Sequence, residues 1–144
     1  MTENASSARA AHDIRVAFSR LRRRLRENYG SGDLTPSQTS VLSRLDKDGE
    51  ASVSDLAALE GIRHQSVATT VGVLVERGLA ARRADPEDGR RQLIFITGSG
   101  HAFLEERRRA GEGWLAQVLE TRCTEAERRT LIEAAALLER VVRR

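Results

Sequence analysis

Six polar side chains lie close together between residues 63 and 70, and all can take part in hydrogen bonds. They are Arg63, His64, Gln65, Ser66, Thr69 and Thr70. Short groups of this kind suit the base edges of a nucleic-acid groove, where Gln pairs well with adenine, and Arg63 suits a phosphate. The same residues also fit an ordinary solvated helix face. The choice between these interpretations depends on the elements around them.

Arginine dominates the basic side chains, with 23 Arg against one Lys. Guanidinium forks match phosphates and guanine edges, although biased codon usage produces the same composition. Four arginines lie at or near one charged loop: Arg82, Arg83, Arg90 and Arg91. The loop itself contains Asp88. A loop of this kind suits the negative potential of a narrow minor groove. Alternatively, the acids of the loop neutralise its arginines in a solvated turn, and Arg82 and Arg83 keep a strand edge polar.

No arrangement in the sequence suits catalysis or metal binding. The histidines His12, His64 and His101 are far apart, and the single cysteine, Cys123, has no partner for a disulfide. No Ser-His-Asp spacing, Gly-rich phosphate loop or zinc motif is present. We therefore expect a binding protein with no catalytic residues, no metal and no cofactor.

The length of 144 residues suits one domain with its own core. We expect a single domain over residues 1–144. The formal net charge is only +3, so a nucleic-acid surface must be local. No apolar run reaches the roughly 20 residues that span a bilayer, and residues 1–13 lack the apolar region of a signal peptide. The expectation is a cytoplasmic protein that does not act at a membrane.

Short helices are predicted around the polar cluster. Thr35-Pro36-Ser37-Gln38 and Ser52-Val53-Ser54-Asp55 each have the residues of a capping box, so a helix is expected to follow each. Gly61 separates the second of these helices from a third, over about 63–77. The inner face of the third helix is predicted to carry Val67, Val71 and Leu74. Two short helices joined by a glycine-containing turn are typical of a helix-turn-helix.

The hydrophobic period changes to that of strands at about 79–83 and 92–97. The intervening segment contains Pro-x-Asp-Gly, which is turn chemistry. The sequence therefore predicts a β-hairpin directly after the helix-turn-helix, which together form a winged helix over about 34–97. The expected fold class is mainly α with a small β-hairpin wing (α+β).

Longer helices are predicted near both ends of the chain, within about 8–30 and 99–144. The first is expected to follow a polar tail at residues 1–7 and to end at glycines 30 and 32. The last helix carries an apolar band too wide for packing on one neighbour, which indicates an interface between subunits. The residues expected at this dimer interface are Ile14, Phe18, Leu131, Ala135, Leu138 and Val142.

The chain resembles the MarR (multiple antibiotic resistance regulator) family over about residues 10–142, and three short motifs carry the resemblance. Its wing signature is similar to Asp85-Pro86-x-Asp88-x-Arg90-x-x-x-Ile94-x-Ile96-Thr97-x-x-Gly100. Its second-helix opening is similar to Leu34-Thr35-x-x-Gln38-x-x-Val41-Leu42, and its recognition-helix exit to Glu76-Arg77-Gly78-Leu79-x-x-Arg82. The resemblance implies a winged-helix homodimer with N- and C-terminal dimerisation helices that regulates promoters. It also implies that Arg90 stabilises the wing or enters the groove, with Asp88 paired to it.

Three functions are compatible with these observations. The first is a homodimeric repressor that binds a pseudo-palindromic double-stranded DNA operator and is released by a small aromatic or lipophilic effector. The second is a DNA-binding regulator that needs no ligand and is controlled by a protein partner. The third is an enzyme, which the lack of catalytic motifs in the sequence disfavours.

Overall fold

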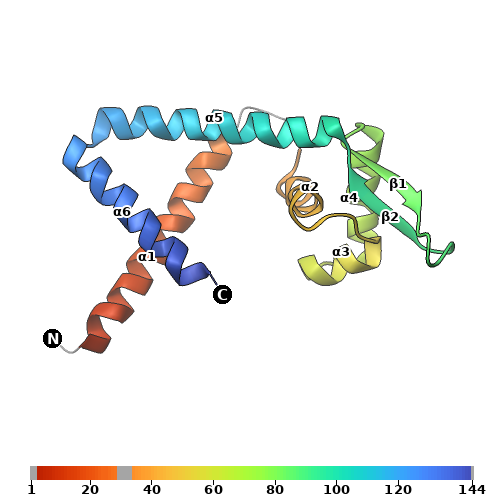
Figure 1. The fold of residues 1–144 in the computed structure, drawn as a ribbon, viewed down its shortest axis with the longest axis horizontal. Coiled ribbons are helices and arrows are strands. Elements are labelled where there is room, and N and C mark those ends of the chain that lie inside the picture. The colour runs from red at the N-terminus through yellow and green to blue at the C-terminus, as the bar shows by residue number, and fades with distance from the viewer. Residues whose placement is uncertain (1–2, 29–33, 144) are drawn as a thin grey trace. The chain divides into compact units, whose positions relative to one another are not determined.

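The computed structural model describes residues 3–28 and 34–143 (Figure 1). Within these residues it contains six helices and one two-stranded antiparallel sheet. The described residues belong to two compact units. We call the one within Ser31–Arg108 the central unit, and the one within Met1–Gly30 and Arg109–Arg144 the terminal unit. The predicted fold class, mainly α with a β-hairpin, is confirmed.

The central unit begins with the predicted helix-turn-helix. Its helices are α2 (Pro36–Asp48), α3 (Val53–Glu60) and α4 (His64–Glu76). Gly61 ends α3 in the left-handed conformation, with φ of 65°. A residue with a Cβ is strained there, so glycine at this position allows the short turn between α3 and α4.

Both predicted capping boxes are formed. The hydroxyls of Thr35 and Ser52 accept the backbone N–H groups of Gln38 and Asp55, at 3.2 and 3.1 Å. In return the side chains of Gln38 and Asp55 accept the backbone N–H groups of Thr35 and Ser52, at 3.0 and 3.3 Å. These reciprocal bonds satisfy donors that a helix start otherwise leaves without a partner, and they fix where α2 and α3 begin.

The predicted hairpin consists of β1 (Ala80–Ala84) and β2 (Gln92–Ile96), which pair antiparallel along their full length. Ala51, in the turn between α2 and α3, adds a backbone bridge to Ile94 with N···O distances of 3.0 and 2.8 Å. β1 begins one residue later than predicted, because the N–H of Leu79 donates to a carbonyl in the last turn of α4. The hairpin is therefore attached to the helices by its backbone as well as by packing.

One continuous apolar core closes the central unit. Its buried members are Val41, Leu42, Leu45, Leu56, Ala57, Val67, Val71, Leu74, Leu79, Ala80 and Ile94. The predicted inner face of α4 is confirmed, since Val67, Val71 and Leu74 are all within this core. Gly100 approaches the hairpin so closely that a Cβ would lie 2.1 Å from the carbonyl oxygen of Leu79. Only glycine fits there, which explains its place in the wing signature.

Helices make up the terminal unit. They are α1 (Glu3–Asn28), the later part of α5 (Gly98–Arg122) and α6 (Glu125–Val142). The prediction of a polar tail is wrong for residues 3–7, because α1 extends back through them from the helix-favouring Ala8, Ala10 and Ala11. The predicted stop at glycines 30 and 32 lies outside the described residues.

A third capping box begins α6 and was not predicted. The Thr124 hydroxyl accepts the N–H of Glu127 at 3.2 Å, and the Glu127 carboxylate accepts the N–H of Thr124 at 2.8 Å. No residue of α6 is fully buried, and α1, α5 and α6 make only sparse contacts with one another in the described chain. None of the described helices is both long and apolar enough to cross a bilayer.

Candidate nucleic-acid interface

The outer face of α4 carries the polar side chains that the sequence singled out. Gln65, Ser66 and Thr69 are exposed and Thr70 is half-buried, whereas the opposite face of the helix lies in the core. The Thr69 hydroxyl donates to the carbonyl oxygen of Gln65 at 3.0 Å. Its oxygen can still accept a hydrogen bond, and its methyl group is available for an apolar contact. The structure therefore places Gln65, Ser66 and Thr69 on one accessible helical surface, with the half-buried Thr70 at its edge.

Positive electrostatic potential is expected at the N-terminal end of α4. Arg63 is the N-cap residue and His64 the first helical residue, and both side chains are exposed. The Arg63 side chain makes no capping hydrogen bond, and the first turn contains no acidic residue. The helix dipole is thus not compensated by a carboxylate in that turn, and together with Arg63 it favours an anion such as a phosphate.

Two aspartates shape the hairpin turn through the backbone. The Asp85 carboxylate accepts the N–H of Glu87 at 2.9 Å, and the Asp88 carboxylate accepts the N–H of Arg90 at 3.1 Å. The family resemblance implied that Asp88 pairs with the Arg90 side chain. Within the described residues the structure shows no ion pair between them, because the tight turn brings the backbone N–H to the carboxylate instead. Asp88 therefore fixes the turn, and the guanidinium of Arg90 remains exposed.

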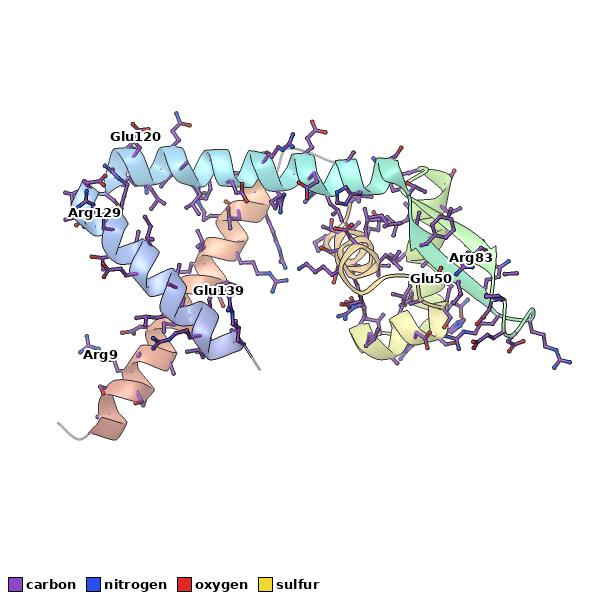
Figure 2. The ribbon with its side chains drawn as sticks, in the orientation of Figure 1. Arg9, Glu50, Arg83, Glu120, Arg129 and Glu139 are labelled. Carbon is purple, nitrogen blue, oxygen red and sulfur yellow. The ribbon has the colours of Figure 1, made fainter. Side chains whose placement is uncertain are left out.

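Arg83, on β1, is bound by a carboxylate from another element. Its Nε donates to Glu50 at 2.6 Å, and its Nη2 donates to the second oxygen of the same carboxylate. Figure 2 shows these two side chains beside each other at the hairpin. Hydrogen bonding to Arg83, followed by its charge, holds the pKa of Glu50 below its usual range. The pair is therefore ionised at neutral pH.

Arg91, at the end of the hairpin turn, is also bound by acids. Its guanidinium donates to Asp55 and lies 3.7 Å from the Asp85 carboxylate. Asp55 simultaneously caps α3, and its hydrogen bonds with Ser52 are the main reason that its pKa is lowered, with the charge of Arg91 adding to this.

The other two arginines of the hairpin differ from this pair. Arg82 and Arg90 are exposed, and neither forms an ion pair with any residue that the structure describes. The four arginines that the sequence grouped together thus fall into two classes, one bound by carboxylates and one accessible to a ligand.

One ion pair and one hydrogen bond attach neighbouring helices to one another. Arg44 of α2 donates to Glu60 of α3 at 2.7 Å. His101 of α5 lies 2.8 Å from the Asp46 carboxylate of α2, and this hydrogen bond is the main reason that the pKa of His101 is raised. These contacts were not predictable from residue spacing, because their partners lie 16 and 55 residues apart.

The residues predicted at a dimer interface are exposed in the single chain. Phe18 of α1 is 61% exposed, and Leu138 and Val142 of α6 are 39% and 70% exposed. Further large apolar side chains on the same two helices are also exposed: Ile14, Leu21, Leu131, Ile132, Leu137 and Val141. The terminal unit therefore presents apolar surface that its own described residues leave uncovered.

Neither a metal site nor a disulfide is formed by the residues in the described ranges. No group of three or more His, Cys, Asp or Glu side chains there has an arrangement that holds a metal ion. Cys123 is a half-buried free thiol between α5 and α6. Its carbonyl oxygen accepts a hydrogen bond from Arg128 at 2.6 Å, which ties α6 to the end of α5.

A helix-turn-helix with an exposed polar second helix, followed directly by an arginine-bearing hairpin, defines a winged helix-turn-helix protein. The model of a family described as the MarR family matches residues 32–91. An uncharacterised HTH-type transcriptional regulator of Mycobacterium bovis is 35% identical over 133 residues, which are 92% of this chain and 92% of that protein.

Solved structures show the same fold. A Pseudomonas aeruginosa protein assigned as a transcriptional regulator is 30% identical, with a TM-score of 0.80 and coverage of 100% of this chain and 99% of that one. A Staphylococcus aureus MepR mutant, solved bound to an oligodeoxyribonucleotide, is 20% identical, with a TM-score of 0.68 and coverage of 93% and 98%. The chain belongs to the MarR family, and it is a DNA-binding transcriptional regulator of the helix-turn-helix type.

Proposed function

We propose that this protein is a homodimeric repressor that recognises a pseudo-palindromic operator through α4 and the hairpin. The observation that carries this proposal is the polar face of α4, which is exposed along the half that begins at Arg63 while its opposite face builds the core. A helix of this kind can lie in a major groove without disturbing the fold. The S. aureus MepR mutant, which has the same fold, was solved on an oligodeoxyribonucleotide.

The proposed site has two parts. The part that reads bases and nearby phosphates on α4 consists of Arg63, His64, Gln65, Ser66, Thr69 and Thr70. The hairpin part consists of residues that contact DNA or hold the hairpin in shape: Arg82, Arg83, Asp88, Arg90 and Arg91. Within it, Arg82 and Arg90 have the accessible guanidinium groups, so they are the side chains that we assign to direct contact with DNA.

Dimerisation is proposed from the uncovered apolar surface of α1 and α6. A second copy that covers Ile14, Phe18 and Leu138 would remove this surface from water and place two α4 helices on one duplex. Two half-sites about one helical turn, or ~34 Å, from each other would then be read together. Ala135, Leu131 and Val142 extend the same face of α6.

Repression is the simplest consequence of such binding. A dimer that occupies a promoter excludes other proteins from it without having to recruit any of them. We further propose that a small aromatic or lipophilic effector releases the dimer from DNA. A thermal-shift screen tests the effector, because a compound that binds the folded dimer must raise its melting temperature. If no compound does so, control by a protein partner becomes the favoured mechanism.

A binding selection on genomic fragments, followed by titration of the recovered operator, tests DNA recognition. Gln65→Ala should weaken operator binding about 10-fold, since a bidentate base contact is lost, and should leave binding to a scrambled duplex unchanged. Gln117→Ala is the matched control, because Gln117 is an exposed glutamine on α5. Equal affinity of wild type and Gln65→Ala for the operator would show that α4 does not read bases there.

A further inference from the structure

Three contacts, which we call ties, attach the hairpin to one short segment of the chain, residues 50–55. Ala51 forms the backbone bridge to Ile94. On either side of Ala51 a carboxylate holds an arginine of the hairpin: Glu50 binds Arg83, and Asp55 binds Arg91. The bridge holds β2, and the ion pairs hold β1 and the end of the hairpin turn.

From this geometry we infer that Arg83 and Arg91 are positioning residues, which hold the hairpin against residues 50–55 so that Arg90 is presented to DNA, and that they do not contact DNA themselves. This inference rests on the proposed function. It divides the hairpin arginines by task, since each of the two bound guanidinium groups would have to leave a carboxylate before it met a phosphate.

Charge supports this division. Each bound arginine is balanced by at least one carboxylate, and Arg91 lies near two, those of Asp55 and Asp85. An arginine that stays bound to its carboxylate neutralises no phosphate, so it releases none of the counterions condensed on DNA. Arg82 and Arg90, which form no ion pair with a described residue, retain their full charge for the phosphate backbone or a groove.

The solvent exposure of these ion pairs indicates which property of the protein a substitution should change. The side chains of Arg91 and Asp55 are 43% and 46% exposed, and solvent screening makes ion pairs of this kind weak contributors to stability. Substitutions in these pairs should therefore leave the fold intact. Their consequence is expected in the position of the hairpin, and DNA binding is the property to measure.

The sign of the effect of Asp55→Asn separates positioning from contact. Asparagine keeps an oxygen for the N–H of Ser52, so the cap of α3 is retained while the charge that binds Arg91 is lost. If Arg91 only positions the hairpin, Asp55→Asn weakens operator binding. If Arg91 contacts phosphate, the same substitution frees its guanidinium and strengthens binding.

The experiment is a double-mutant cycle on the full-length protein with two probes, the selected operator duplex and a scrambled duplex of equal length, over a range of salt concentrations. We expect Arg91→Gln and Asp55→Asn each to weaken operator binding about fivefold, and the double variant to be no weaker than either single variant. Binding of Arg91→Gln to the scrambled duplex and its salt dependence should stay as in the wild type. Glu50→Gln and Arg83→Gln should repeat this pattern at the second tie.

Arg90→Gln is the matched control. It should weaken binding to both duplexes and lower the slope of log K against log salt by about 1. A lower salt slope for Arg91→Gln, or stronger binding by Asp55→Asn, would overturn the positioning role. If Arg90→Gln has no effect, the proposed hairpin contact with DNA fails instead, so the two failures are distinguishable.

Discussion

Apolar side chains are distributed differently in the central and terminal units. In the central unit three helices and the hairpin bury one core, in which Leu42 and Ile94 are completely inaccessible to solvent. In the described part of the terminal unit, α1 and α6 expose large apolar side chains such as Phe18 and Val142. Both regions are helical, so secondary structure alone does not account for the difference.

We relate this difference to the proposed functions of the two units, DNA recognition and dimerisation. A surface that reads DNA should hold its side chains in place before it binds. In the central unit, the closed core, the capped helices and the contacts that attach the hairpin to residues 50–55 keep the proposed surface rigid. The apolar face of α6 has no comparable cover among the described residues, and in the proposed dimer a second copy covers it. Four predictions test this contrast and the packing of the central unit, in order of decreasing expected effect.

The largest effect is expected from a charge on the apolar face of α6. Leu138→Glu would bury an unpaired carboxylate at the proposed interface, so the protein should be monomeric at micromolar concentration. Operator affinity should then fall about 100-fold or more, since the gain from two linked modules is lost. Sedimentation velocity and DNA titration measure the two effects. Ala136→Glu, with the same new charge on the polar face of α6, should change neither, and a dimeric Leu138→Glu protein would argue against this interface.

A cavity in the central core should produce the next largest effect. Leu42→Ala removes a side chain with no solvent exposure and should lower the free energy of unfolding by about 2–5 kcal/mol. Urea denaturation at fixed protein concentration measures the loss. The dimer dissociation constant should be unaffected, because Leu42 lies in the other unit. A loss below about 1 kcal/mol would mean that the core is less closed than described.

Equivalent helix caps in the two units should contribute differently to the free energy of unfolding. Ser52→Ala removes the cap of α3 at a buried position and leaves the N–H of Asp55 without its acceptor. We expect a cost of about 1–2 kcal/mol. Thr124→Ala removes the same type of cap from the exposed start of α6, where water can replace the hydroxyl, and should cost about 0.5 kcal/mol. Equal costs in thermal unfolding would contradict the assignment of the two environments.

The smallest effect concerns pH. Because bonding to Asp46 raises the pKa of His101, the pair stabilises the fold fully below the unfolded pKa of about 6.5. This stability is lost as pH rises through the raised pKa of the folded state. Nearby Glu105 favours the protonated form and Arg108 opposes it.

The melting temperature of the wild type should accordingly fall more than that of His101→Gln between pH 6 and 8.5. The effect should be small, since the His101 side chain is 56% exposed. Asp46→Asn should behave like His101→Gln. Parallel pH profiles for wild type and variants would show that the pair does not stabilise the fold.

Local signals in the sequence predicted most of the central unit. The capping boxes at Thr35 and Ser52, the inner face of α4 and the hairpin turn all depend on residues within a few positions of one another, and the structure confirms each. The capping box at the start of α6 was not predicted, although Thr124 and Glu127 have the residue types and the spacing of one. The start of α1 was placed too late because a polar, alanine-containing segment suits both a tail and a helix.

Hydrophobic periodicity does not predict contacts between residues that are far apart in the sequence. Arg83 and Glu50 are 33 positions apart, and Arg91 and Asp55 are 36 positions apart. Nothing in the spacing of the four hairpin arginines distinguished the two that bind carboxylates from the two that remain accessible. The exposure of Gln65, Ser66 and Thr69 on α4 follows from helical spacing alone, whereas the internal division of the hairpin required the folded chain.

Hydroxyl-radical footprinting of the selected operator, with the mass of the complex measured on the same duplex, tests the central claim most directly. Two copies of the chain should bind each duplex and protect two half-sites whose centres are about 10 base pairs from each other. A single protected half-site with one copy per duplex would contradict the proposal that two central units, joined through their terminal helices, read DNA together.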